Sequence, residues 1–157
     1  MKKLALVVIA IIGFGVSKTN AQSEYNSAAG LGIDFGSDIV TLVGPSGKFF
    51  FQPEHAVTTE LLFGSDIMLI TALYQYHGNI EGAEGLKWFA GAGPSLYLGI
   101  GDASGSSFAL RPSVGLDYKI NNVPLAFSFD WRPAIIFEEG SGFQGAQFGL
   151  GFRYAFN

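Results

Sequence analysis

The clearest strand pattern in the chain is Pro124-Leu125-Ala126-Phe127-Ser128-Phe129-Asp130-Trp131. Large apolar side chains alternate in it with small or polar ones, which places the large ones on one face of an extended strand. The same period of two recurs in segments 86–100, 108–119 and 147–156, and more weakly in 31–35, 57–63 and 68–77. The sequence therefore predicts β-strands, each with one bulky apolar face and one small or polar face.

Short polar turns separate these segments, as in antiparallel hairpins. We predict eight strands, at residues 28–36, 39–51, 56–64, 67–77, 85–101, 107–119, 123–137 and 143–156. Gly44-Pro45, within the second strand, predicts a bulge or a break there, because proline cannot donate to a ladder. The expected fold class is all-β, an eight-stranded antiparallel up-and-down β-barrel.

The first 21 residues have the composition of a secretory signal peptide. Lys2 and Lys3 precede an apolar run, 4–16, which is shorter than the roughly 20 residues that a membrane helix needs. Thr19-Asn20-Ala21 then provides a small-x-small cleavage site. We expect residues 1–21 to be removed and residues 22–157 to form one β-barrel domain.

Side-chain volume indicates which face of the barrel points outward. An eight-stranded barrel is only wide enough inside to be filled by side chains, so the small and polar faces fit the lumen. The bulky apolar faces then lie outside, where water would drive aggregation and lipid would not. We therefore predict a porin-like transmembrane β-barrel in the outer membrane of a Gram-negative cell, with both termini on the periplasmic side.

The predicted inner faces also carry charge, and the outer faces carry none. The inward charges are Asp34, Lys48, Glu60, Lys87, Arg111, Asp117, Lys119, Asp130, Arg132 and Arg153. A charge on the lipid face would cost about 2–4 kcal/mol at the bilayer midplane, so this segregation is expected of a membrane barrel. We interpret these residues as a lumenal network of buried ion pairs, because lone buried charges are costly. A narrow polar pathway for solutes is the alternative.

The last strand ends in alternating aromatic residues, Phe152, Tyr154 and Phe156, followed by Asn157. This pattern resembles the insertion signal by which the barrel assembly machinery recognises outer-membrane proteins. Further segments carry the same resemblance, namely 44–51, 73–77, 85–89, 115–119 and 127–133. Together they resemble a family of small outer-membrane β-barrel domain proteins. The resemblance implies the barrel and its location, and it brings no activity, ligand or functional residue.

Few residues are suited to catalysis or metal binding. The chain has no cysteine and two histidines, His55 in a predicted turn and His77 at a predicted strand end, which is no recognised ligand spacing. Glycine strings such as Gly91-Ala92-Gly93 lie within predicted strands, without the following helix that a phosphate loop requires. We therefore expect no enzymatic activity, no cofactor and no metal site.

Charge limits the partners. Three of the nine basic residues lie in 1–21, so residues 22–157 carry six against 13 acidic residues, a net charge of −7. Nucleic acid, which needs a basic surface, is not an expected partner. We expect a monomer that contacts outer-membrane lipid and lipopolysaccharide, and the assembly machinery during insertion. We interpret acidic loops such as Glu138-Glu139 as solvated ends, with divalent-cation bridging to lipopolysaccharide as the alternative.

The sequence thus predicts a non-enzymatic integral outer-membrane barrel with a structural or small interaction role. Two alternatives stay open. One is a narrow channel for small solutes. The other is a soluble lipocalin-like ligand binder, in which the apolar faces would line the interior.

Overall fold

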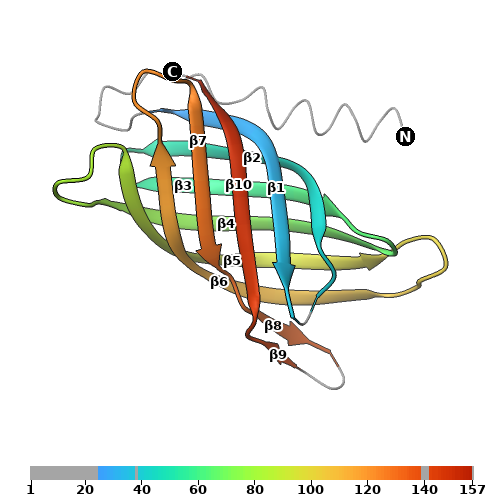
Figure 1. The fold of residues 1–157 in the computed structure, drawn as a ribbon. Helices are drawn as coiled ribbons and strands as arrows, with labels where there is room; N and C mark the ends of the chain where they lie inside the picture. Colours follow the sequence, from blue (N-terminus) through green and yellow to red (C-terminus); the bar gives the residue numbers. More distant parts are fainter. Residues whose placement is uncertain (1–24, 38, 139–141, 157) are drawn as a thin grey trace.

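Ten β-strands joined by short turns form one closed antiparallel barrel in the computed structural model, which describes residues 25–37, 39–138 and 142–156 (Figure 1). The strands are β1 (Ser27–Gly36), β2 (Leu42–Gln52), β3 (His55–Phe63), β4 (Ile67–Asn79), β5 (Leu86–Gly99), β6 (Ser106–Lys119), β7 (Leu125–Trp131), β8 (Ala134–Phe137), β9 (Phe143–Gln144) and β10 (Gln147–Phe156). Over the described ranges, no helix has the length and apolar character to cross a membrane. The proposed signal peptide, 1–21, lies outside these ranges.

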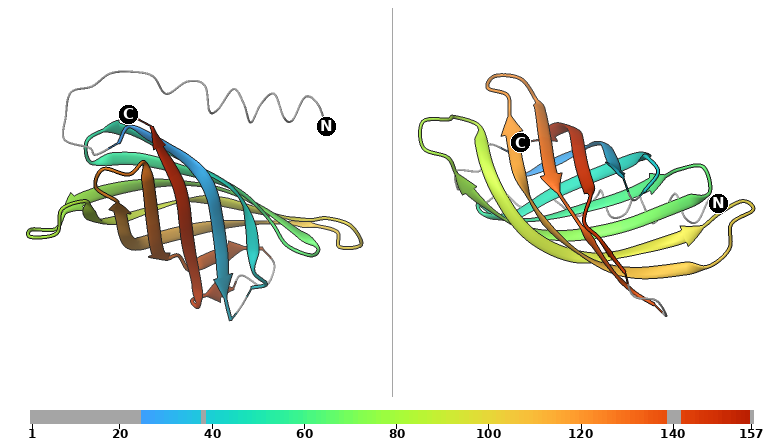
Figure 2. Two further views of the ribbon diagram at one scale, coloured as in Figure 1. Left: turned by 45° about the horizontal axis from the view of Figure 1, so that its top comes forward. Right: turned by 60° about the horizontal axis from the view of Figure 1, so that its bottom comes forward.

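Consecutive hairpins build the wall, and the first and last strands close it. Each of the strands β1 to β6 pairs with the next strand along the chain. β7 then pairs with β10, and β10 pairs with β1, which closes the ring. The two views in Figure 2 show the strands curving around one interior. The predicted eight-stranded antiparallel barrel is therefore confirmed, and its eight strands are formed by ten segments.

The seventh and eighth predicted strands are each divided in two. β7 and β8 both pair with β6 and are separated by Arg132-Pro133, while Gly145-Ala146 separates β9 from β10. Pro133 has no N–H to donate, so the ladder is interrupted there. Beyond this break, β8 and β9 pair with one another and project from the barrel as a short hairpin (Figure 1).

The bulge or break expected at Gly44-Pro45 is absent, and that expectation was wrong. β2 runs through both residues, and its register with β3 is the same before and after them, from Val43 to Phe50. A Cβ at Gly44 would strike the carbonyl oxygen of Leu61, so the glycine lets β2 lie close to β3 without bending away. The irregularity in β2 lies instead between Phe50 and Gln52.

The two ends of the barrel differ. The terminal rim carries the described ends of the chain and the turns 53–54, 80–85 and 120–124. The distal rim carries the turns 64–66 and 100–105 and the β8–β9 hairpin. An apolar cluster that includes Tyr25 and Ala28 lies toward the terminal rim, and Leu42, Leu62 and Leu69 pack together toward the distal rim. Polar side chains fill the space between these two clusters.

Lumenal charge cluster as the candidate functional site

Eight of the ten inward charges proposed from the sequence are buried inside the barrel. They are Asp34, Lys48, Glu60, Arg111, Asp117, Asp130, Arg132 and Arg153, each no more than 3% exposed. We call these eight residues the lumenal charge cluster. Lys87 and Lys119 are only partly buried and lie at the terminal rim. The Lys119 Nζ donates to the carbonyl oxygens of Ile120 and Val123, at 2.9 and 2.8 Å, so this lysine does not join the cluster.

Two ion pairs cross the full width of the barrel. Lys48 on β2 pairs with Asp117 on β6, and Arg132 after β7 pairs with Glu60 on β3. In the ring of eight barrel strands, β2 and β6 lie four strands apart, and so do β3 and β7. These pairs therefore act as crossbars between opposite walls.

Two guanidinium groups form the centre of the cluster. Arg132 donates from Nε and Nη2 to the two carboxylate oxygens of Asp130, at 2.8 and 2.6 Å, in addition to its pair with Glu60. Arg153 donates from Nη2 to Glu60 at 3.3 Å. Its remaining donors reach Ser46 Oγ at 2.9 Å and Ser128 Oγ at 2.8 Å. Glu60 is thus shared by two arginines from different strands.

A third arginine binds the walls nearer the distal rim. Arg111 Nη2 donates to Asp34 at 3.2 Å, to Gln147 Oε1 at 2.7 Å and to the carbonyl oxygen of Arg132 at 3.0 Å. Tyr97 donates to the same Gln147 oxygen at 3.3 Å. The arrangement connects β1, β5, β6 and β10.

The lumenal charge cluster is electrically balanced. It contains four cations and four carboxylates, and each one is within ion-pair distance of an opposite charge. Removing a charge from water carries a penalty of several kcal/mol, and pairing with additional hydrogen bonds offsets it. The cluster can therefore occupy the lumen as a stable, neutral filling.

Inward glycines make room for the arginines. A Cβ at Gly149 would overlap the guanidinium of Arg132, and one at Gly151 would overlap that of Arg153. The same is true in milder form at Gly32, where a Cβ would lie 2.9 Å from a Glu60 carboxylate oxygen. The wall therefore carries glycine at positions where the large charged side chains lie against it.

Several residues of the site were not proposed from the sequence. Ser113 donates to Asp130 at 2.7 Å, and Tyr25 donates to Asp117 at 2.9 Å. Gln147, Ser46 and Ser128 supply the further contacts described above. The inward positions of the serines and Gln147 follow from the strand period, but neutral side chains in such positions give no signal of which charge they contact.

The outer face contrasts with the lumen. Large apolar side chains are exposed along every long strand, for example Leu31, Val114, Leu116, Phe129 and Phe152. In the described strands, all charged side chains occupy the inward-facing positions. The aromatic residues of the proposed insertion signal, Phe152, Tyr154 and Phe156, are among the exposed outer residues.

Tyrosine and tryptophan gather on the outer face toward the terminal rim. Tyr74 and Tyr76 on β4 lie beside Trp88 on β5, with Tyr76 and Trp88 rings 5.8 Å apart. Their polar atoms contact rim groups, since the Tyr76 hydroxyl donates to Glu54 at 3.0 Å and the Tyr74 oxygen lies 2.5 Å from His55 Nδ1. Each of the two tyrosines thus combines an exposed apolar ring with a hydrogen bond at the rim.

The two histidines lie on opposite faces of the barrel wall. His55 lies on the outer face at the rim, whereas His77 is buried inside, 1% exposed. Among the described residues, no three His, Asp or Glu side chains are grouped to hold a metal ion. Comparison with family models, curated proteins and solved structures found no match.

Proposed function

We propose that this chain is an integral outer-membrane β-barrel of a Gram-negative cell, without catalytic activity, with a structural or small interaction role. The observation that carries the proposal is the segregation of charge. Every charged side chain of the described strands occupies an inward position, and the surface between the rims is apolar. A barrel in water would have the opposite arrangement, because exposed apolar patches of this extent cause association.

Two further features support a bilayer around the barrel. Aromatic side chains with polar tips, such as Tyr74, Tyr76 and Trp88, gather near one rim, as in the aromatic girdles at membrane interfaces. The closed ring of strands also satisfies the backbone groups of the wall, which an open edge in lipid would not. Outer-membrane lipid and lipopolysaccharide are then its surroundings, and the assembly machinery its partner during insertion.

The filled lumen supports a role that does not involve solute passage. The crossbars Lys48–Asp117 and Arg132–Glu60 lie across any path along the barrel axis. The soluble lipocalin-like alternative needs an apolar cavity, and between the two rims this interior is lined by the paired charges. We therefore place the interaction surface of the protein at its rims and outer face, and we propose that it acts as a monomer.

Fractionation of cells that produce the full chain tests the location. We expect the protein in the outer-membrane fraction, with unheated samples migrating differently from boiled samples on a detergent gel, because a closed barrel resists detergent. Recovery in the soluble fraction without detergent would overturn the proposal.

Planar bilayers separate the closed barrel from the narrow channel. We expect no conductance in repeated experiments in which insertion of the purified protein is verified. Discrete, reproducible conductance steps would favour the narrow channel instead. Solutes would then have to pass the arginines of the lumenal charge cluster, which would not close the lumen.

A further inference from the structure

A lysine at the terminal rim faces the lumen without an acidic partner among the described residues. Lys87 is the register neighbour of Asp117 on β6, but the oxygens of Asp117 already accept hydrogen bonds from Tyr25 and Lys48. The Lys87 Nζ lies 5.7 Å from the centre of the Phe50 ring. Its three donors are therefore free for a charge-assisted contact with another group.

His77, next to this lysine, has unsatisfied nitrogens in the interior. It is 1% exposed, and neither Nδ1 nor Nε2 has a hydrogen-bond partner. The distance from Nε2 to Asp117 Oδ2 is 3.7 Å, too long for a hydrogen bond. The His77 ring contacts the same Phe50, at 4.8 Å between centroids. Buried polar groups nearly always have a partner, so this imidazole points to a bound molecule or water.

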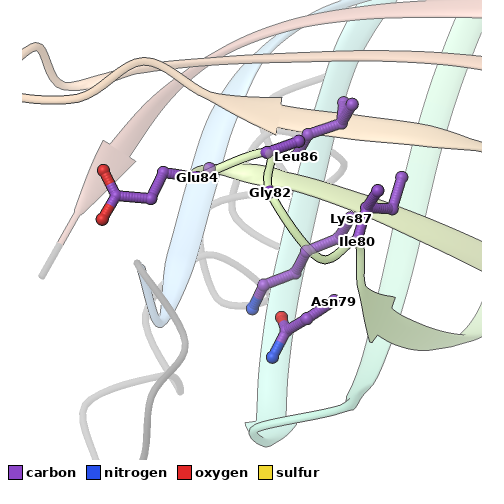
Figure 3. A pocket seen from close by; sticks show the side chains of 8 residues that line it. Asn79, Ile80, Gly82, Glu84, Leu86 and Lys87 are labelled. Atoms are coloured by element: carbon purple, nitrogen blue, oxygen red, sulfur yellow. The ribbon is translucent and has the colours of Figure 1, made fainter.

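A pocket lies at the terminal rim beside Lys87. It has a volume of about 740 Å³ and is lined by Asn79, Ile80 and residues 82–87 (Figure 3). Asn79 and Lys87 are register partners, and their side chains extend side by side. His77 lies two residues before Asn79 in β4, on the same face of the strand and farther from the rim. A molecule that enters the pocket therefore meets an amide and an ammonium group first.

Three nearby carboxylates, Glu84, Glu54 and Asp117, have other partners. Glu84 in the turn extends away from Lys87, and its Oε2 lies 3.5 Å from the side-chain amide of Asn121 (Figure 3). Glu54 at the same rim accepts a hydrogen bond from Tyr76 on the outer face. Inside, the charge of Asp117 is offset by Lys48. The corner thus keeps the positive charge of Lys87.

We propose that this corner is a binding site for a small oxyanion of the phosphate class. Lys87 supplies the charge, Asn79 an amide donor, and His77 an imidazole N–H at the inner end. The site rests on the closed barrel and its register, and it stands whether or not the barrel lies in the outer membrane. Its failure and the failure of the proposed location are therefore separate results.

The two histidines provide a direct test by NMR. The full mature chain, 22–157, is refolded in a zwitterionic detergent, and inorganic phosphate is titrated at constant pH and ionic strength against chloride. We expect a saturable shift of the His77 side-chain resonances and none at His55, which lies on the outer face against Tyr74. The titration gives the dissociation constant for phosphate.

Matched lysine variants assign the charge. Lys87→Gln should weaken phosphate binding at least about tenfold, the effect of losing one charge-assisted hydrogen bond. Lys119→Gln removes a rim cation whose Nζ is held by backbone carbonyls, and it should leave binding unchanged. Asn79→Ala serves as a second variant, with a weaker loss. Heat-modifiable migration of each variant reports that its barrel is closed.

Three results would overturn the site. The first is no saturable His77 shift in a wild-type barrel with heat-modifiable migration. The second is an unchanged dissociation constant in both Lys87→Gln and Asn79→Ala. The third is a response to short-chain phosphatidic acid but none to inorganic phosphate, which would make a lipid headgroup the occupant in place of a small free anion.

Discussion

Lys48 and Asp117 form a buried ion pair although their strands, β2 and β6, lie on opposite sides of the barrel. Asp117 also accepts a hydrogen bond from Tyr25, so one carboxylate connects three parts of the wall. The pair is enclosed, with 1% and 4% of the two side chains exposed. Its two members therefore depend on one another more strongly than ion pairs at a surface do.

Removing one member of this pair should destabilise the barrel. Asp117→Asn leaves the Lys48 ammonium buried without a counter-charge, and we expect the free energy of unfolding to fall by about 3–5 kcal/mol. Urea titration in phospholipid vesicles, followed by tryptophan fluorescence, measures this change.

The double variant Lys48→Met/Asp117→Asn, compared with Lys48→Met alone, is the control, because it removes both charges together. It should recover most of the loss, giving a coupling energy that a double-mutant cycle reports. Additive effects of the two single changes would show that the residues do not interact.

The space beside the buried arginines should be too small for an added methyl group. Gly149→Ala places a methyl group onto the Arg132 guanidinium, and we expect it to destabilise the barrel by about 1–3 kcal/mol. Gly47→Ala is the matched control in another strand, because its methyl group would meet mainly the Phe49 ring, at 3.3 Å. The same unfolding assay compares them, and equal losses at the two positions would contradict the close contact.

Depth in the bilayer should decide the effect of a charge on the outer face. Val114 lies near the middle of β6 and is exposed, so Val114→Arg should cost about 2–4 kcal/mol of stability in vesicles. The same substitution at Val123, in a turn of the terminal rim, should cost about 0–1 kcal/mol. If both positions accept arginine equally well, the outer face does not lie in lipid.

Single cysteines can report which rim faces the cell exterior, because the chain has no cysteine of its own. Ser104→Cys places a thiol in an exposed turn of the distal rim, and Asn121→Cys places one in an exposed turn of the terminal rim. With an even number of barrel strands and periplasmic termini, an impermeant maleimide should label intact cells at position 104 only. Labelling at position 121 alone would reverse the orientation.

The strand pattern could be predicted from the sequence because the period of two fixes which residues share a face. Phe89 and Tyr97 are large, yet their positions in β5 place them inward, as the period requires. The breaks after Trp131 and after Gln144 were not predicted, since a proline or a glycine inside a long strand can equally be tolerated. Gly44-Pro45 shows the tolerated outcome.

The membership of the charge cluster could be predicted only in part. Whether a side chain faces the lumen follows from its position within its own strand. The period of two therefore identified the eight buried charges. Whether a charge reaches the cluster depends on its height along the barrel, and Lys87 and Lys119 lie too near the rim. The pairing of Arg132 with Glu60 across the lumen depends on how the ring closes, which no local pattern contains.

The crossbars also have a consequence for assembly. Most partners are distant along the chain, with separations of 69 residues for Lys48 and Asp117, 72 for Arg132 and Glu60, and 93 for Arg153 and Glu60. A half-curled sheet would present these groups uncompensated on its concave side. The buried charges therefore all find their partners only when the ring closes, and the electrostatics favour the closed barrel over partly curled sheets.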